Sequence, residues 1–413
     1  MSVTTVETPS AVAVTTFTAT GSLGAWIAAV KAAGAGIATR VPVPVLAGVK
    51  IAADSLGVVS VSRFDYETAT LIEVSGASGS ANRSTLVNHK MLLDILVAAG
   101  KRATKRVSDA WQVTISQERL ELEPTKVLVN VNGTTFTLAP MDDEMYPVQP
   151  SMECDTWVAV DAAEFIRRMD SAMISASTDD TLPILTGIKI EVKGREMTLL
   201  STDRYRLTLA ELFIERPLGE HDYAGEYSVL VRSKTWKAFK RHLSPKGGRI
   251  ELHFHEAMAG YGYRVSFHQG DVSLGTLAVD GDYPKIRSLF PDTTPIVFEM
   301  DADLLLANVQ SVAVTAERNT PVRLTYNGID SLRVDAGTGE DAQAQAFMPY
   351  HAERGQRGFA VAFNPHYLID ILKDMKGQVV QIHHTTAPKP AMFEAAGQAD
   401  ISHLLMPVRL PGA

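Results

Sequence analysis

The chain has 413 residues, of which 46% are hydrophobic and 21% charged, with a formal net charge of −8. This length suggests roughly two to four domains, and the composition is typical of a globular protein with cores to bury. No apolar stretch reaches the about 18 residues of a membrane span. A single cysteine, Cys154, excludes an intrachain disulfide and favours a reducing, cytoplasmic setting. Residues 1–11 are interpreted as a flexible extension that lacks the cationic start of a secretory leader.

One order of predicted elements recurs three times along the chain. Each copy begins with a helical segment, continues into a proline-led pair of strands with alternating apolar and polar residues, and ends with a second helix. Pro44, Pro183 and Pro321 open these strand pairs and recur at an interval of about 138 residues. Asp65 and Asp203 keep the same register. Helices are expected at 21–34, 88–100, 161–177, 233–243 and 364–375, with Asn88, Ser233 and Asn364 as N-caps of the later helix in each copy.

The predicted fold class is α+β, with three tandem domains. Proline-containing segments at 143–150 and 281–291 separate the copies, which places the domains at 12–150, 151–292 and 293–413. Two helices can cover only one face of an antiparallel sheet, so neighbouring copies must protect the remaining edges. Tandem copies whose ends match can close into a ring.

The repeated segments resemble a known family. In chain order they read "PVPVLAGV", "FDYE", "TLPILTGI", "STDRYRL", "GDYPKIRSLFP", "AERNTPVRL", "FNPHYLIDIL" and "LLMPVRLPG", and together they span residues 14–412. They resemble the bacterial DNA polymerase III beta subunit, the sliding clamp, in an actinobacterial form. The resemblance implies three copies of the DNA clamp fold per chain, a head-to-tail homodimer ring of six domains around duplex DNA, and no catalysis or cofactor. It implies a processivity factor that tethers the polymerase alpha subunit, the clamp loader and repair proteins.

A sliding surface needs positive charge without base-specific contacts, because base readout would hold it at one sequence. In the helix from Ser233, Trp236 and Phe239 share one side, while the basic residues share the other. The alternative for such a stripe is a solvated helix face. Asp179 and Asp180 depart from the basic pattern, which puts loop contacts from the second copy in doubt. By resemblance, the DNA-facing residues are Arg40, Lys101, Arg102, Lys105, Arg167, Arg168, Lys234, Lys237, Lys240, Arg241 and Lys373.

The apolar tail "HLLMPVRLPGA" indicates a chain end that is packed, or available for packing, where most chain ends are polar. Met406 has a flexible thioether suited to several ligands, and Arg206 and Arg409 could hold the polar ends of a peptide. The alternative is an ordinary last strand of the third sheet, and both descriptions can hold together. By resemblance, the partner-peptide pocket comprises Leu185, Thr202, Arg204, Tyr205, Arg206, Leu207, Pro284, Leu289, Pro390, Leu404, Met406, Pro407, Val408, Arg409 and Leu410.

Ring closure by resemblance pairs a strand edge around Phe136 and Leu138 with residues Val314 and Thr315 of the third copy. The alternative for Phe136 is a core position, since edge and core strands look alike in sequence.

Two rival functions stay open. An enzyme would use Asp203 with His383, His384, or the pair His253 and His255, although no metal-ligand spacing or phosphate-binding loop accompanies them and Asp203 fits a turn-capping role. A phage-borne or resistance accessory clamp would keep the fold and change the partners.

Overall fold

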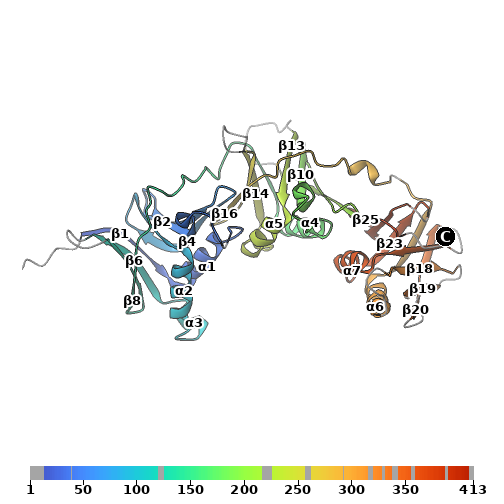
Figure 1. Ribbon diagram of the computed structural model, residues 1–413, viewed down its shortest axis with the longest axis horizontal. Coiled ribbons are helices and arrows are strands. Elements are labelled where there is room, and N and C mark those ends of the chain that lie inside the picture. The colour runs from blue at the N-terminus through green and yellow to red at the C-terminus, as the bar shows by residue number, and fades with distance from the viewer. Residues whose placement is uncertain are drawn as a thin grey trace, which may run out of the picture. The chain divides into compact units, whose positions relative to one another are not determined.

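The computed structural model describes residues 14–38, 40–119, 125–215, 226–255, 262–291, 293–314, 320–327, 331–336, 343–354, 359–386 and 389–408 (Figure 1). The chain forms two compact units. Unit 1 combines the chain up to Ala159 with Lys234–Leu277, and unit 2 combines Val160–Ser233 with the chain from Ala278 onward. The units divide the second copy between them, so the domain boundaries expected at 150 and 292 stay a prediction.

Unit 1 holds the first copy and the later half of the second. Its elements from the first copy are β1 (Val14–Ser22), α1 (Leu23–Ala33), β2 (Gly48–Ala53), β3 (Val58–Phe64), β4 (Thr68–Gly79), β5 (Arg83–Asn88), α2 (His89–Gly100), α3 (Lys105–Ser108), β6 (Gln112–Arg119), β7 (Lys126–Val131) and β8 (Thr134–Leu138). Those from the second copy are α5, which begins at the unit boundary (Ser233–Phe239), β14 (Arg249–His255), β15 (Arg264–Gln269) and β16 (Val272–Leu277). Strand β9 (Trp157–Asp161) leads from this unit into the next.

Unit 2 holds the earlier half of the second copy and the whole third copy. The second copy supplies α4 (Ala162–Ile174), β10 (Gly187–Lys193), β11 (Glu196–Thr202), β12 (Arg206–Phe213) and β13 (Glu226–Arg232). The third copy supplies β17 (Ile296–Asp301), α6 (Ala302–Ala313), β18 (Val322–Tyr326), β19 (Ser331–Ala336), β20 (Ala344–Pro349), β21 (His351–Arg354), β22 (Phe359–Phe363), α7 (Pro365–Asp374), β23 (Val379–His384), β24 (Ala391–Ala395) and β25 (Gln398–Leu405).

Strands from successive copies pair within one sheet in each unit. In unit 1 the order is β8-β7-β6-β1-β4-β16-β15-β14, and β4 meets β16 in antiparallel register from Ile72↔Val272 to Thr68↔Thr276. In unit 2 the order is β13-β10-β11-β12-β25-β24-β23-β17-β21, and β12 meets β25 from Arg206↔Leu405 to Ala210↔Ile401. The next copy therefore pairs with the sheet edges that one copy alone would leave unprotected.

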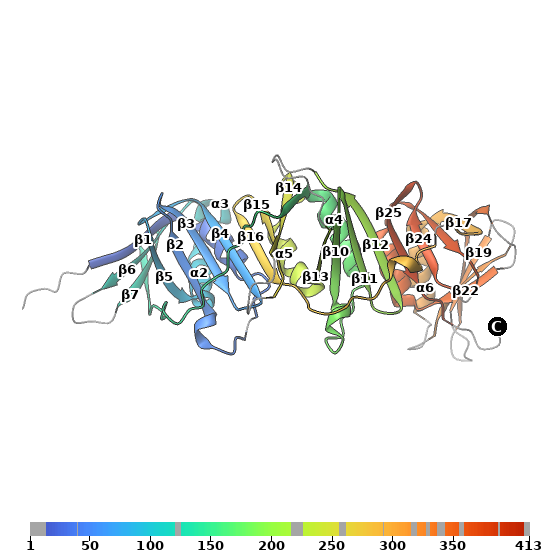
Figure 2. The same ribbon diagram turned by 90° about the horizontal axis from the view of Figure 1, so that it is seen from above.

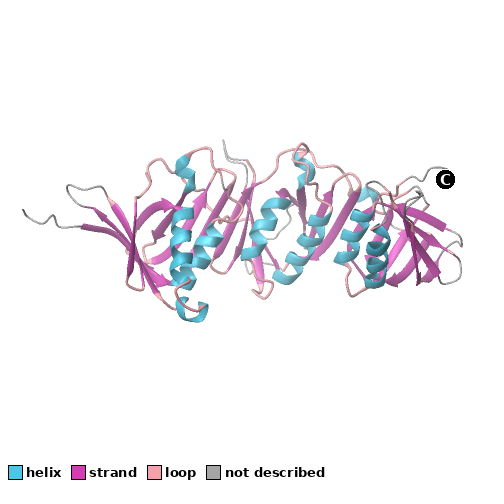
Figure 3. Cartoon of the chain, turned by 60° about the horizontal axis from the view of Figure 1, so that its bottom comes forward, coloured by secondary structure: helices cyan, strands magenta, loops and turns pink. Residues whose placement is uncertain are grey.

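Helices cover one face of these sheets (Figure 3). α1 packs against β4, α4 against β12, and α6 against α7. Trp26, Phe165 and Leu305 are fully buried on these helices. The predicted N-caps at Asn88 and Asn364 are confirmed, because each side chain accepts a backbone N–H of its helix, whereas Ser233 is the first residue of α5 itself.

The repeat extends to a single turn. Asp65 accepts the N–H groups of Glu67 and Thr68 at 3.2 and 2.7 Å, and Asp203 accepts those of the corresponding residues, Tyr205 and Arg206, at 3.0 and 2.9 Å. The residue after each aspartate has a left-handed backbone, with φ of 74° at Tyr66 and 81° at Arg204. Both copies therefore use the carboxylate to fix the same strained turn.

Candidate functional site

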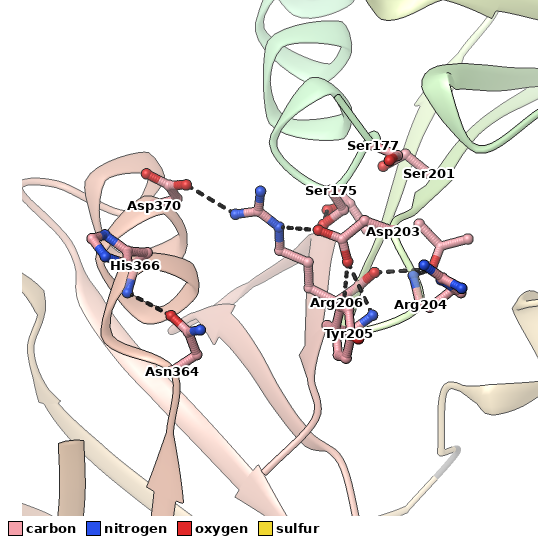
Figure 4. A network of polar contacts seen from close by, with 12 residues as sticks. Ser175, Ser177, Ser201, Asp203, Arg204, Tyr205, Arg206, Asn364, His366 and Asp370 are labelled. Carbon is pink, nitrogen blue, oxygen red and sulfur yellow. Dashed lines mark hydrogen bonds and ion pairs between the residues drawn. The ribbon is translucent and has the colours of Figure 1, made fainter. Parts of the chain in front are cut away.

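The candidate peptide pocket of unit 2 is centred on the turn between β11 and β12, and Figure 4 shows the polar contacts of that turn. Asp203 Oδ1 accepts the two backbone N–H groups of the turn, and its Oδ2 lies 2.9 Å from Arg206 Nε. The interpretation of Asp203 as a turn-capping residue is confirmed. Its side chain is 11% exposed, and both oxygens serve the turn and the adjoining arginine.

Arg206 joins this turn to helix α7. Its Nη1 donates to Asp370 Oδ2 at 2.9 Å (Figure 4). The guanidinium also lies 4.6 Å from the centre of the Tyr367 ring. The side chain is 11% exposed and is held by two carboxylates and an aromatic face. Arg206 therefore positions the turn against α7, and its contact with a peptide stays a prediction.

Tyr367 and Asp370 were missed by the sequence analysis. Tyr367 also stacks on Tyr205, with the ring centres 5.9 Å apart. The two α7 residues are three positions apart, which places them on one face of a helix whose start was predicted at Asn364. That spacing was a usable signal, but which face meets β12 depends on the β12–β25 pairing.

The floor of the candidate pocket comes from Leu207 on β12 and Leu404 on β25, which face each other in the strand register. Both are buried and belong to an apolar cluster that continues along the sheet through Leu200, Leu209, Ile286 and Met392. Met406 follows the strand and donates its N–H to the Tyr205 carbonyl at 2.9 Å, which ties the tail to the turn.

Exposed apolar side chains among the residues predicted for the pocket are termed its rim. Tyr205 is 53% exposed, Leu289 57% and Met406 40%, and Val408 is also exposed. An exposed apolar rim on a buried apolar floor marks an interaction surface.

The remaining predicted pocket residues are distributed as follows. Leu185 and Thr202 are buried, and Thr202 Oγ1 accepts the Arg204 N–H at 3.1 Å. Arg204 and Pro284 are exposed, while Pro390 and Pro407 are half-buried. Arg409 and Leu410 lie outside the described residues.

The predicted amphipathic character of α5 is confirmed. Trp236 and Phe239 are fully buried, and Leu243 is buried where the helix gives way to a 3-10 turn at Lys240–His242. Lys234, Lys237 and Arg241 are exposed, and Lys240 is half-buried. The helix is shorter than the predicted 233–243.

Three further basic residues predicted to face DNA in unit 1 lie in an exposed group after α2. Lys101, Arg102 and Lys105 are exposed, and Arg102 also donates to Thr134 Oγ1 at 2.6 Å. Arg40 is exposed. In unit 2, Lys373 is exposed at 57% and lies 3.9 Å from Asp370.

Arg168 is not available as a DNA contact. It is 8% exposed, donates to the Glu211 carbonyl at 2.6 Å, and lies 2.7 Å from Asp400. Its neighbour Arg167 is more exposed and lies 3.6 Å from the same carboxylate. The structure therefore uses Arg168 to hold α4 against β12 and β25.

The predicted interface residues lie on β8, at the end of the sheet order in unit 1, and directly after helix α6 in unit 2. β8 ends the sheet of unit 1, with Phe136 half-buried and Leu138 buried. β20 ends the four-stranded sheet β20-β19-β18-β22 of unit 2, where Phe347 is 58% exposed. Val314 is 84% exposed after α6, and Thr315 lies outside the described residues.

Comparisons with known proteins bear on this arrangement. Models for the central and C-terminal domains of the DNA polymerase III beta subunit match residues 159–285 and 287–409. The beta sliding clamp of Micrococcus luteus is 36% identical over 321 residues, which cover 78% of this chain and 95% of the relative. That of Streptomyces coelicolor is 33% identical over 391 residues, covering 93% and 97%. The chain belongs to the beta sliding clamp family.

Solved sliding clamps share the fold. The crystal structure of the DNA polymerase sliding clamp from Bacillus subtilis is 20% identical, with a TM-score of 0.82 over 95% of this chain and 99% of that one. The sliding clamp family consists of processivity factors of DNA polymerase III that carry out no catalysis. The three tandem copies of the clamp fold and the actinobacterial resemblance are confirmed.

The residues of the rival enzyme have structural partners in this clamp. His384 is 1% exposed and packs among the rings of Phe298, Tyr326 and Phe359, and burial lowers its pKa to about 3. His253 Nδ1 lies 3.1 Å from the backbone N of Cys154, and His255 Nε2 lies 2.9 Å from Ser266 Oγ.

Across the described residues, no helix combines the length and apolar character needed to cross a bilayer.

Proposed function

We propose that this clamp binds short linear peptides of its partners in the pocket beside the Asp203 turn. The observation that carries the proposal is the exposed apolar rim of Tyr205, Leu289 and Met406 above a buried apolar floor. A peptide with apolar side chains can bury its surface there at about 25 cal/mol for each Å² removed from water. The partners are the polymerase alpha subunit, the clamp loader and repair proteins, all in the cytoplasm.

The proposal includes a ring that surrounds duplex DNA. Two chains associate head to tail, with the β8 edge of one chain meeting the third copy of the other near Val314. The three domains of each chain run from 12 to 150, from 151 to 292 and from 293 to 413. A head-to-tail contact between unlike surfaces closes into a ring when the rotation between subunits allows it.

The inner surface of the ring is proposed to contact DNA without regard to base sequence. Its contacts come from Arg40, Lys101, Arg102, Lys105, Arg167, Lys234, Lys237, Lys240, Arg241 and Lys373. Phosphate contacts weaken steeply with salt, and the chain carries a net charge of −8. Encirclement removes the need for tight adhesion, because a closed ring leaves DNA only at an end or by opening.

The decisive experiment compares retention on nicked circular DNA with retention after the circle is cut. Loaded protein should persist on the circle at high salt and be lost from the linear form. Equal retention on both would contradict encirclement.

The molecular mass in solution should be twice the chain mass of 44.7 kDa. A monomer at micromolar concentration in low salt would argue against the ring. A panel of host polymerase and loader peptides separates the chromosomal clamp from an accessory copy.

A further inference from the structure

A concave site lies in unit 2, on the sheet face that carries Leu207 and Leu404. Its floor comes from β12, β25, β24 and β23, the first three of which lie side by side in Figure 2. One wall comes from the segment that connects the second copy to the third. The cavity is about 530 Å³, within the range of small-ligand sites. Its lining includes Leu209, Glu211, Arg287, Phe290, Met392 and Glu394.

This groove is distinct from the peptide pocket. Leu209 and Met392 line it and also belong to the apolar cluster whose other end, at Leu207 and Leu404, underlies the pocket. Ile286 and Phe290 of the connecting segment pack on that cluster. The segment therefore crosses the sheet face between the two sites.

One cation in the groove is already engaged. Arg287 Nη2 lies 2.7 Å from Glu211 Oε1, and its Nη1 donates to Thr198 Oγ1 at 3.2 Å. This pair spans the rim, where the Arg287 side chain is 55% exposed. The Glu211 charge is thereby balanced within the protein.

Glu394 is the carboxylate that lacks a permanent cation. It accepts a hydrogen bond from the Ser402 hydroxyl, and its Oε2 lies 3.5 Å from His383 Nε2. The Nδ1 of His383 lies 2.9 Å from Thr294 Oγ1. Among the described residues, no lysine or arginine nitrogen comes within 4.0 Å of Glu394, although its side chain is only 14% exposed. A carboxylate with so little solvent is stabilised when a cation pairs with it.

The apolar part of the lining suits the rest of a basic side chain. Leu209, Met392 and Phe290 provide a surface for an alkyl stem, and Glu394 lies on β24 two residues beyond Met392. Lysine and arginine bury their stems on apolar surface and keep the charged group at a polar partner. The groove therefore offers both parts of one recognition site.

We propose that this groove binds a lysine or arginine side chain of a protein partner docked on this face of the clamp. Charge complementarity to Glu394 selects a cation, and the volume admits the whole side chain with its flanking backbone. A protein is favoured over a free amine because the groove opens on the face that carries the exposed pocket rim. The proposal does not depend on peptide binding in the pocket.

Methionine-methyl NMR of the full-length protein tests it, since Met392 reports on the groove and Met406 on the pocket. The probe is acetyl-Phe-Lys-amide, and its matched control is acetyl-Phe-norleucine-amide, which keeps the alkyl stem and lacks the charge. We expect the Met392 signal to move saturably with the lysine probe, about tenfold more weakly with the control, and the Met406 signal to stay in place. Equal responses to both probes, or movement of Met406 alone, would overturn the proposal.

Two variants sharpen the test. Glu394→Gln should weaken the lysine probe about tenfold, while Glu299→Gln, which changes a carboxylate bonded to Gln381 outside the groove lining, should leave binding unchanged. If Glu394→Gln does not fold, Ala399→Lys decides the matter, because Ala399 is an exposed lining residue and a resident lysine would compete for Glu394. Undiminished binding to Ala399→Lys, or to a folded Glu394→Gln, would reject the site.

Discussion

His403 Nε2 lies 3.1 Å from Asp374 Oδ2 and joins strand β25 to helix α7. The other ring nitrogen lies 2.8 Å from Thr208 Oγ1, and Thr208 in turn bonds the Ser175 hydroxyl at 2.7 Å. His403 has no exposed surface. The series links the third copy to β12 and to the end of α4, and its burial suits it to hold the two copies together.

Asp374→Asn should therefore destabilise the fold. The change removes the charge from a largely buried hydrogen-bonded pair, which costs about 1–3 kcal/mol. Denaturant unfolding measures the difference. Asp94→Asn is the control, because Asp94 pairs with Lys90 at the surface, and it should change stability little. Equal stability of the Asp374 and Asp94 variants would contradict the assignment.

The same aspartate should give a pH signature. Burial alone would raise the pKa of Asp374, but hydrogen bonds from His403 and Ser171 hold it below 3.8. The ionised Asp374 therefore contributes to the stability of the fold above its unfolded-state pKa, and this contribution is lost as pH falls through its folded-state pKa. The stability gap between the wild type and Asp374→Asn should narrow below about pH 3.8. A constant gap at lower pH would contradict this.

His384 should make the clamp sensitive to milder acid. Burial lowers its pKa from 6.5 to about 3, so between these values the unfolded chain takes up a proton that the folded chain does not. Because of this group, the free energy of unfolding should fall by about 1.4 kcal/mol for each pH unit below 6.5. His384→Phe, at a site lined by aromatic rings, should remove that slope in urea unfolding measured at several pH values. An unchanged slope would show that other groups dominate.

Met406→Ala together with Leu289→Ala should abolish peptide binding. Both side chains are exposed on the pocket rim, so their truncation removes contact surface without opening the core. Fluorescence anisotropy with a labelled polymerase peptide measures the loss. Met145→Ala, which changes an exposed methionine elsewhere, is the control. Peptide affinity that survives the double change would reject the pocket.

Asp370→Asn tests whether Arg206 positions the turn. Losing this partner should loosen Tyr205 and weaken peptide binding by several-fold, because the rim residue Tyr205 stacks on the same helix. The substitution should affect peptide affinity more than it affects the midpoint temperature of thermal unfolding. If affinity is unaffected while stability falls, Arg206 has only a structural role.

Replacing Lys234, Lys237 and Arg241 with Glu should impair loading on DNA. All three are exposed, and the buried face of α5 is untouched, so the fold should remain. The salt dependence of loading should also become shallower as phosphate contacts are lost. Unchanged loading would remove α5 from the inner surface.

The sequence predicted what depends on local pattern. Pro44, Pro183 and Pro321 marked the strand pairs, and Asn88 and Asn364 marked helix starts, because these residues act on their immediate neighbours. The intrachain partners of Arg168 and Arg206 could not be predicted, for the opposite reason. Their partners Asp400 and Asp370 lie 232 and 164 residues away, and only the pairing of β12 with β25 brings them together.

That pairing also bears on the joining of three copies in one chain. β4 and β12 each bond a strand of the following copy, so a polypeptide with one copy alone would leave two rows of backbone donors and acceptors bare. A single copy could satisfy them only by associating with other chains. Joining the copies in one polypeptide makes this strand pairing independent of protein concentration.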